Sequence, residues 1–112
     1  MKTNKNQIIE NEYKVLSALE KEPSTTQRNL AGELNFSIGK VNYVIKNLYS
    51  RGLIKLGNFA GSENKPGYMY ILTPKGAKEK LIITQRFLEE KIEEYEQIQL
   101  QITELKEKLE KH

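Results

Sequence analysis

The sequence predicts a mainly α-helical fold that carries one small β-hairpin and ends in a long helix. Apolar residues recur every three or four positions through the first 49 residues, as they do along the buried face of a helix. After Gly52 the pattern changes to short β-branched and aromatic runs around a polar stretch. Beyond Pro74 there is no further proline and one glycine, Gly76, so a single helix can continue to the end.

Two helices are predicted before residue 35. The first covers 7–20 and ends before Pro23, and its apolar face consists of Ile9, Tyr13, Leu16 and Leu19. The second follows Thr26, whose hydroxyl is the expected N-cap, and its narrow apolar face consists of Leu30, Ala31 and Leu34.

A tight turn and a third helix follow. Asn35 stands where the chain must turn, and Asn tolerates the left-handed backbone conformation that ends helices. Ser37 is the expected N-cap of a helix over 38–49, which Ser50-Arg51-Gly52 ends. Its inward residues are predicted to be Val41, Val44, Ile45 and Leu48.

The next segment predicts a hairpin that leads into the last helix. Strands are expected at 53–56 and 68–72, joined by the polar stretch NFAGSENKPG. Thr73 followed by Pro74 offers an N-cap and a proline at the first helical position, which is a strong helix start.

The last helix carries a coiled-coil pattern. Leu81, Leu88, Tyr95, Ile102 and Leu109 follow one another at seven-residue spacing, with Ile98 and Leu105 between them in the last two heptads. A helix of this length overshoots a body of about 70 residues, so we expect it to pair with a second copy of the chain. The predicted dimerisation residues are Leu81, Leu88, Ile92, Tyr95, Ile98, Ile102, Leu105 and Leu109. The alternative is a single helix folded back on its own domain.

The composition argues against most enzymes and metal sites. Cysteine and aspartate are absent, and the only histidine is the terminal His112. Zinc clusters, Cys-His or Ser-His nucleophiles and Asp-based calcium loops therefore lack their residues. We expect no catalytic residue, no metal and no cofactor. Because no stretch approaches the ~20 apolar residues of a membrane helix and the start lacks a signal-peptide core, we expect a cytoplasmic protein without a membrane partner.

Charge is distributed unevenly along the chain. Residues 23–80 carry nine Lys or Arg against three Glu, whereas residues 81–112 carry five against eight. A basic body attracts phosphate and an acidic helix is repelled by it, so the middle of the chain is the expected nucleic-acid-binding part.

Three helices, a hairpin and a further helix, with a tight turn between the second and third, form the layout of a winged helix-turn-helix. Residues 1–76 are then the DNA-binding domain and 77–112 the dimerisation helix. In this layout the third helix, about 37–50, enters the major groove, and the wing, about 53–73, lies on the flanking backbone or minor groove. The predicted DNA contacts are Gln27, Arg28, Ser37, Gly39, Lys40, Asn42, Tyr43, Lys46, Asn64 and Lys65.

For several of these residues a role without DNA contact is the alternative. Tyr43 could pack where the third helix meets the wing, Lys46 could be a solvated surface lysine, and Glu63 weakens the charge of the wing. The alternative function is a protein-interaction adaptor, in which the winged helix binds another protein and the coiled coil mediates the association of chains. The third helix carries no acid, which fits DNA better than an adaptor surface of mixed charge.

The chain resembles the small MarR-family regulators associated with exopolysaccharide gene clusters. The resemblance is carried by TTQRNLAGELNFSIGKVNYVIKNLYSRGLIKLGNF (25–59), by NKPGYMYILTPKGAKEK (64–80) and by the long Glu-rich helix. It implies a dimeric transcription regulator that binds palindromic operator DNA as its double-stranded partner. Larger MarR proteins hold a small-molecule pocket between helices on both sides of the winged helix. This chain has one short helix before and one long helix after, which argues against an effector pocket of that kind.

Overall fold

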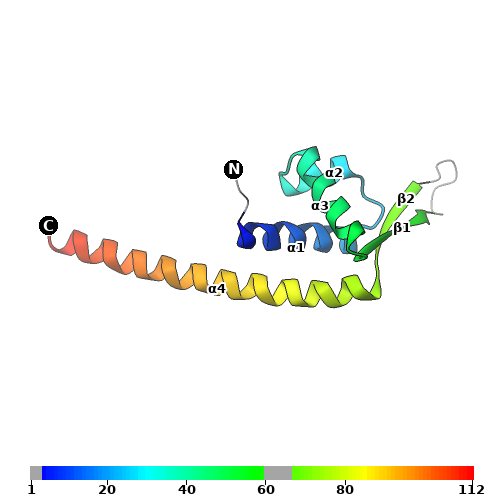
Figure 1. Cartoon of the computed structure of the whole chain (residues 1–112). Coiled ribbons are helices and arrows are strands. Elements are labelled where there is room, and N and C mark those ends of the chain that lie inside the picture. Colours follow the sequence, from blue (N-terminus) through cyan, green and yellow to red (C-terminus); the bar gives the residue numbers. More distant parts are fainter. Residues whose placement is uncertain (1–3, 60–66) are drawn as a thin grey trace.

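A computed structural model describes residues 4–59 and 67–112 and shows a small helical head on a long helix (Figure 1). The elements in chain order are α1 (Lys5–Lys21), α2 (Gln27–Leu34), α3 (Ile38–Ser50), β1 (Ile54–Phe59), β2 (Gly67–Leu72) and α4 (Pro74–Glu110). The predicted fold class, mainly α with a small hairpin and a long final helix, is confirmed.

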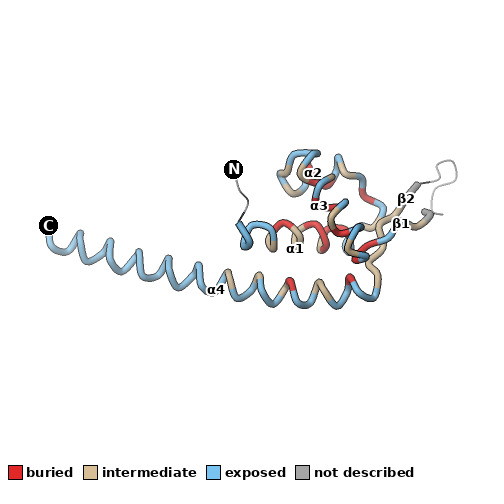
Figure 2. Tube along the Cα trace, in the orientation of Figure 1, coloured by how far each residue is buried: buried red, intermediate tan, exposed pale blue. Residues whose placement is uncertain are grey.

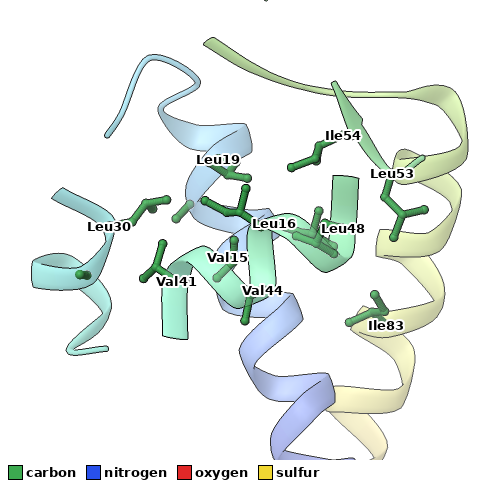
Figure 3. Packing of buried hydrophobic residues seen from close by; sticks show 13 residues of the cluster. Val15, Leu16, Leu19, Leu30, Val41, Val44, Leu48, Leu53, Ile54 and Ile83 are labelled. Carbon is green, nitrogen blue, oxygen red and sulfur yellow. The ribbon is translucent and has the colours of Figure 1, made fainter. Parts of the chain in front are cut away.

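The core of the head lies where α1, α2 and α3 meet (Figure 3). Leu16, Leu30, Val41 and Leu48 are fully buried there, and Leu53 at the entrance of the hairpin closes one end. The residues predicted to face inward on all three helices lie in or against this cluster. The face of α1 is wider than predicted, because it also buries Val15 and Ala18. Full burial of one such side chain stabilises the head by about 1.5–3 kcal/mol.

The helix ends follow the predicted capping residues. Thr26 Oγ1 accepts a hydrogen bond from Asn29 N at 3.0 Å, and Ser37 Oγ accepts one from Lys40 N at 3.0 Å. Asn35 has a φ of 59°, in the left-handed region, and ends α2 as predicted. Each capping hydroxyl satisfies a backbone N–H that the helix itself leaves without a partner, and the backbone N–H of Asn35 donates to Ala31 O at the end of α2.

The two strands are antiparallel, with Ile54 opposite Leu72 and Phe59 opposite Gly67. Both strands are longer than predicted: β1 leaves out Leu53 but continues through Gly57 to Phe59, and β2 already begins at Gly67. The backbone also joins β2 to the head, since Tyr70 N donates to Pro23 O at 2.9 Å. The hairpin is therefore held against the segment between α1 and α2.

The long helix α4 begins at the predicted signal. Thr73 Oγ1 accepts from Gly76 N at 2.9 Å, and Pro74 occupies the first turn. Ile83 is buried against the head, and the Phe87 ring lies 4.9 Å from that of Tyr13 on α1. Further along, every residue from 91 to 112 is exposed (Figure 2). The molecule measures 69 × 27 × 26 Å, because the distal half of α4 extends beyond the head.

Candidate nucleic-acid interface

The outward face of α3 is polar and carries no acidic residue. Val41 and Leu48 have no exposed surface, whereas Tyr43 on the opposite side is 71% exposed. Gly39 and Lys46 are also exposed, and Asn42 is half-buried. Helical spacing places Gly39, Asn42, Tyr43 and Lys46 along one stripe, because they are three or four residues apart. This stripe can offer amide, hydroxyl and ammonium groups to a ligand that lies along α3.

Gly39 has open space in front of it. A Cβ built there meets only Ser37 Oγ, at 4.0 Å, so the fold does not require a glycine at this position. Gly39 is the second residue of α3, and glycine favours a helix less than alanine does, by at most about 1 kcal/mol. A glycine that weakens the helix without a packing reason is expected where a ligand approaches the backbone closely.

The first turn of α3 is arranged around Ser37 and Lys40. The Ser37 hydroxyl accepts from Lys40 N and keeps its own proton for donation. Lys40 Nζ lies 3.9 Å from the centre of the Phe36 ring, which holds the ammonium beside the helix start. Positive charge and free N–H groups at a helix N-terminus form a favourable place for a phosphate.

The start of α2 adds a second set of donors. Thr26 caps Asn29 N, so the preceding N–H groups of Gln27 and Arg28 have no partner within the helix. Arg28 is exposed, and Gln27 lines a cleft of ≈ 210 Å³ together with Lys46 of α3 and Tyr70 of β2. The structure therefore brings Gln27 and Lys46 to one cleft between α2, α3 and the hairpin.

Tyr43 faces α1 and not the wing. It lines a cleft of ≈ 400 Å³ with Lys40 and Asn47 of α3 and with Gln7 and Ile8 of α1. Packing at the junction of α3 and the wing, the alternative interpretation of this tyrosine, is not what the structure shows. The phenol is open to solvent on the same side of the head as Lys40.

The lysines on the outward side of α3 are not paired with carboxylates. In the part of the chain that the structure describes, neither Lys40 nor Lys46 forms an ion pair. In contrast, Lys80 pairs with Glu20 at 2.6 Å and Lys91 with Glu10 at 3.1 Å, both between α4 and α1. Lys40 and Lys46 therefore leave positive charge on α3 that no carboxylate of the described chain pairs with.

The opposite end of α3 is held by the Arg51 clasp, formed by Arg51, Glu12, Asn47 and Glu79. Arg51 Nη1 donates to Glu12 Oε2 at 3.0 Å and to Asn47 Oδ1 at 2.9 Å, and Nη2 lies 3.8 Å from Glu79 Oε1. These contacts join α1, the end of α3 and α4. From the sequence Arg51 is predicted only to help end the third helix, because Glu12 and Glu79 are distant from it in the chain.

The remaining sequence-predicted site residues fall elsewhere. Asn64 and Lys65, the predicted contacts of the wing, lie outside the described residues. The eight predicted dimerisation residues are all exposed and lie along α4, apart from α3. Ile38, not among the predicted contacts, is an apolar residue with 51% of its surface exposed at the start of α3. Its position outside the inward stripe was the signal for it.

Three helices, a two-stranded wing joined to the loop after α1, and an exposed acid-free third helix together define a winged helix-turn-helix. Residues 10–55 match the family model described as winged helix-turn-helix DNA-binding. No curated protein sequence matches this chain.

Solved structures with the same fold include several regulators. A MarR family transcription regulator aligns with a TM-score of 0.56 at 18% identity, over 91% of this chain and 74% of its own. The zinc-responsive MarR family member ZitR of Lactococcus lactis gives 0.55 at 20% identity, over 88% and 62%. A transcriptional regulator homologue from Pyrococcus horikoshii OT3 gives 0.54 at 18% identity, over 81% and 90%. At these identities the likeness concerns the fold.

Among the residues described, no helix is long and apolar enough to span a membrane.

Proposed function

We propose that the chain is a sequence-specific, double-stranded DNA-binding transcription regulator of the MarR type. The observation that carries this proposal is the stripe of Gly39, Asn42, Tyr43 and Lys46 on α3. It is exposed or half-buried, contains no acid, and is presented by a fold whose third helix commonly enters the major groove. The proposed activity is binding and not catalysis.

Each residue on α3 has a proposed role. Asn42 reads adenine through a bidentate amide contact, and Lys46 reaches guanine or phosphate. Gly39 lets the backbone approach the bases. Ile38 adds an apolar contact of the kind that thymine methyl groups favour.

The flanking groups position the helix on the duplex. Ser37 and Lys40 at the start of α3, and Gln27 and Arg28 at the start of α2, are proposed to bind phosphates, which set register without reading sequence. The wing is proposed to lie on the adjacent backbone or minor groove, with Asn64 and Lys65 as its contacts.

Two copies are proposed to act together through α4. Residues 1–76 form the reading head, and 77–112 form the dimerisation helix through its exposed apolar residues. A symmetric dimer binds an inverted repeat whose half-site centres are about 34–36 Å apart, or a multiple of that. The resemblance of residues 25–59 and 64–80 to small MarR regulators supports an operator near an exopolysaccharide gene cluster.

The first test is fluorescence anisotropy with two duplexes over a range of salt. One duplex is the region upstream of the chain's own gene, and the other has the same composition in scrambled order. We expect a preference for the upstream duplex that survives at high salt, with a log–log slope set by several phosphate contacts. Equal and weak binding to both, repeated with duplexes selected from random sequence, would overturn the proposal and favour a protein partner for the head.

A further inference from the structure

An apolar stripe on the distal half of α4 has no cover in the described structure. The distal stripe consists of Tyr95, Ile98, Ile102, Leu105 and Leu109. Their exposed fractions run from 47% for Ile102 to 78% for Leu109, and Figure 2 shows this part of α4 exposed all round. Five large apolar residues at heptad spacing on an exposed helix indicate a helical partner.

The distal stripe lies on nearly the same side of α4 as the head. Ile83 and Phe87 face the head, and Ile98 and Leu105 follow them at intervals close to whole helical turns. Ile98 also lines a cleft of ≈ 400 Å³ with Asn6 at the start of α1. A helix that covers the stripe therefore passes beside the beginning of α1.

Charge differs between the two ends of this distal region. Residues 89–96 contain five Glu and one Lys, whereas residues 106–111 contain three Lys and two Glu. Glu10 of α1 adds to the acidic end, because it lines the same small cleft as Glu90 and Glu94. Burial, and then the neighbouring carboxylates of Glu94 and Glu10, raise the pKa of Glu90.

We propose that the distal stripe pairs antiparallel with the same stripe of a second copy, centred on Leu100. This assignment rests on the proposed homodimer and adds its orientation and register. Tyr95 then packs against the partner subunit's Leu105, and Ile98 against the partner subunit's Ile102. By symmetry these contacts occur twice and give four apolar layers. The basic end of each helix lies beside the acidic end of the other and beside the start of α1.

Lys91 and Glu94 decide between the two orientations. In a parallel pair, heptad spacing would place Lys91 against the partner subunit's Lys91 inside the seam, and Glu94 beside an uncharged Gln99. In the antiparallel pair Lys91 faces the partner subunit's Leu109, and Glu94 flanks the partner subunit's Lys108. Lys91 Nζ lies 3.1 Å from both Glu10 and Glu94, so the ammonium stays at the edge while its aliphatic stem meets the leucine.

Cysteine cross-linking tests the orientation, because the chain has no cysteine of its own. Three full-length variants are oxidised under the same conditions: Tyr95→Cys, Leu105→Cys and the double variant. In the antiparallel register a single cysteine lies about 15 Å along the axis from its copy, too far for a disulfide. We expect neither single variant to cross-link and the double variant to form a covalent dimer.

The other outcomes separate this inference from the proposed function. Cross-linking of both single variants would establish a parallel pair, overturning the antiparallel register but leaving the homodimer intact. No cross-link in any variant, with a dimer seen by sedimentation, would place the interface elsewhere. A monomer by sedimentation for the wild-type chain would overturn the homodimer itself. In each case, fluorescence anisotropy with DNA tests separately whether the head binds the duplex.

Charge reversal provides a second test that leaves the apolar residues of the distal stripe unchanged. Glu94→Lys and Lys108→Glu each place like charges together twice per antiparallel dimer, so we expect the dimer Kd to rise roughly three- to thirty-fold. The double variant restores both pairs and the wild-type Kd. Glu96→Lys, the matched control, changes the same charge on the outer side of the helix. A parallel pair would contradict this pattern, since Glu94→Lys would then leave the Kd unchanged or lower it.

Discussion

Gly39 on the exposed face of α3 and Gly76 in the first turn of α4 are both helical, but the structure surrounds them differently. A Cβ at Gly39 meets open space apart from Ser37 Oγ, whereas a Cβ at Gly76 would lie 1.9 Å from Leu53 O. Steric exclusion by the fold therefore explains Gly76. It does not explain Gly39, which leaves ligand approach as the proposed reason.

Substitution of Gly39 by alanine separates folding from binding. We expect Gly39→Ala to raise the free energy of unfolding by at most about 1 kcal/mol, because alanine favours the helix even in its first turn. DNA affinity should fall roughly tenfold, since the methyl group occupies the space proposed for the duplex. Gly32→Ala on α2 is the matched control, because a Cβ there is likewise unobstructed, with nothing within 4 Å. Equal DNA affinity for both variants would remove Gly39 from the interface.

Substitution of Asn42 and of Lys46 should change DNA binding in different ways. Asn42→Ala is expected to cost about 1–3 kcal/mol of discrimination at one base pair in each half-site, because an amide read there is lost. Lys46→Ala, if the ammonium binds phosphate, weakens all duplexes alike and lowers the salt slope by about one. Anisotropy against the operator and single-base variants measures both effects. Uniform loss for Asn42→Ala would contradict its reading role.

At the scale of elements, the start of α4 is tied to the entrance of the hairpin. Thr73 N donates to Leu53 O at 3.0 Å, and Thr73 Oγ1 donates to Gly52 O at 2.6 Å while it caps α4. Gly76 lies against the same carbonyl of Leu53. The wing and α4 therefore cannot move independently at this point.

Gly76→Ala should break this close contact. The added methyl group cannot coexist with the Leu53 backbone, so we expect destabilisation by about 1–3 kcal/mol as α4 moves away. Ala77→Gly, at an exposed neighbouring position, should cost about 1 kcal/mol through helix propensity alone. Urea unfolding followed by circular dichroism compares the two. If Gly76→Ala lowered the free energy of unfolding less than Ala77→Gly, the backbone around Leu53 would have to move aside at little cost, contrary to this prediction.

The contact between α1 and α4 should weaken in acid. The hydrogen bond from Lys91 lowers the pKa of Glu10 below its ordinary value, so ionised Glu10 stabilises the fold above the ordinary glutamate range. That stabilisation is lost as the pH falls through the lowered value, while Glu90, whose pKa is raised, offsets part of the loss by accepting a proton. In Glu10→Gln, the urea midpoint of unfolding should therefore fall less steeply with decreasing pH below about pH 4 than in the wild-type chain. Glu104→Gln, which removes the same charge from distal α4, should keep the wild-type slope.

For the whole molecule, the distal half of α4 links dimerisation to DNA affinity. A chain cut after Ile92 loses the distal stripe but keeps Ile83 and Phe87, which pack on the head. We expect a monomer by sedimentation and a loss of about 10²-fold in operator affinity, because two linked heads bind with avidity. Binding to a single half-site should change little. A dimer that survives the cut would show that the proximal helix or the head holds the two copies together.

The amino-acid sequence by itself determined the local features of this protein. Thr26, Ser37 and Thr73 cap helices where predicted, Asn35 turns the chain, and the inward residues of α1, α2 and α3 follow from spacing. These features depend on residues three to seven positions apart, so the pattern contains their physical cause. The stripe on α4 is readable for the same reason.

Only the tertiary structure decided what those elements face. Arg51 joins Glu12 and Glu79, Tyr70 pairs with Pro23, and Gly76 lies against Leu53, although each pair is far apart in the chain. The wing strands also extend past the predicted ends, because pairing across the hairpin continues through residues that local propensity assigns to a loop. Packing between distant segments sets such contacts. The spacing of apolar residues in the sequence shows which face of an element is buried. Which segment packs against that face depends on the tertiary structure.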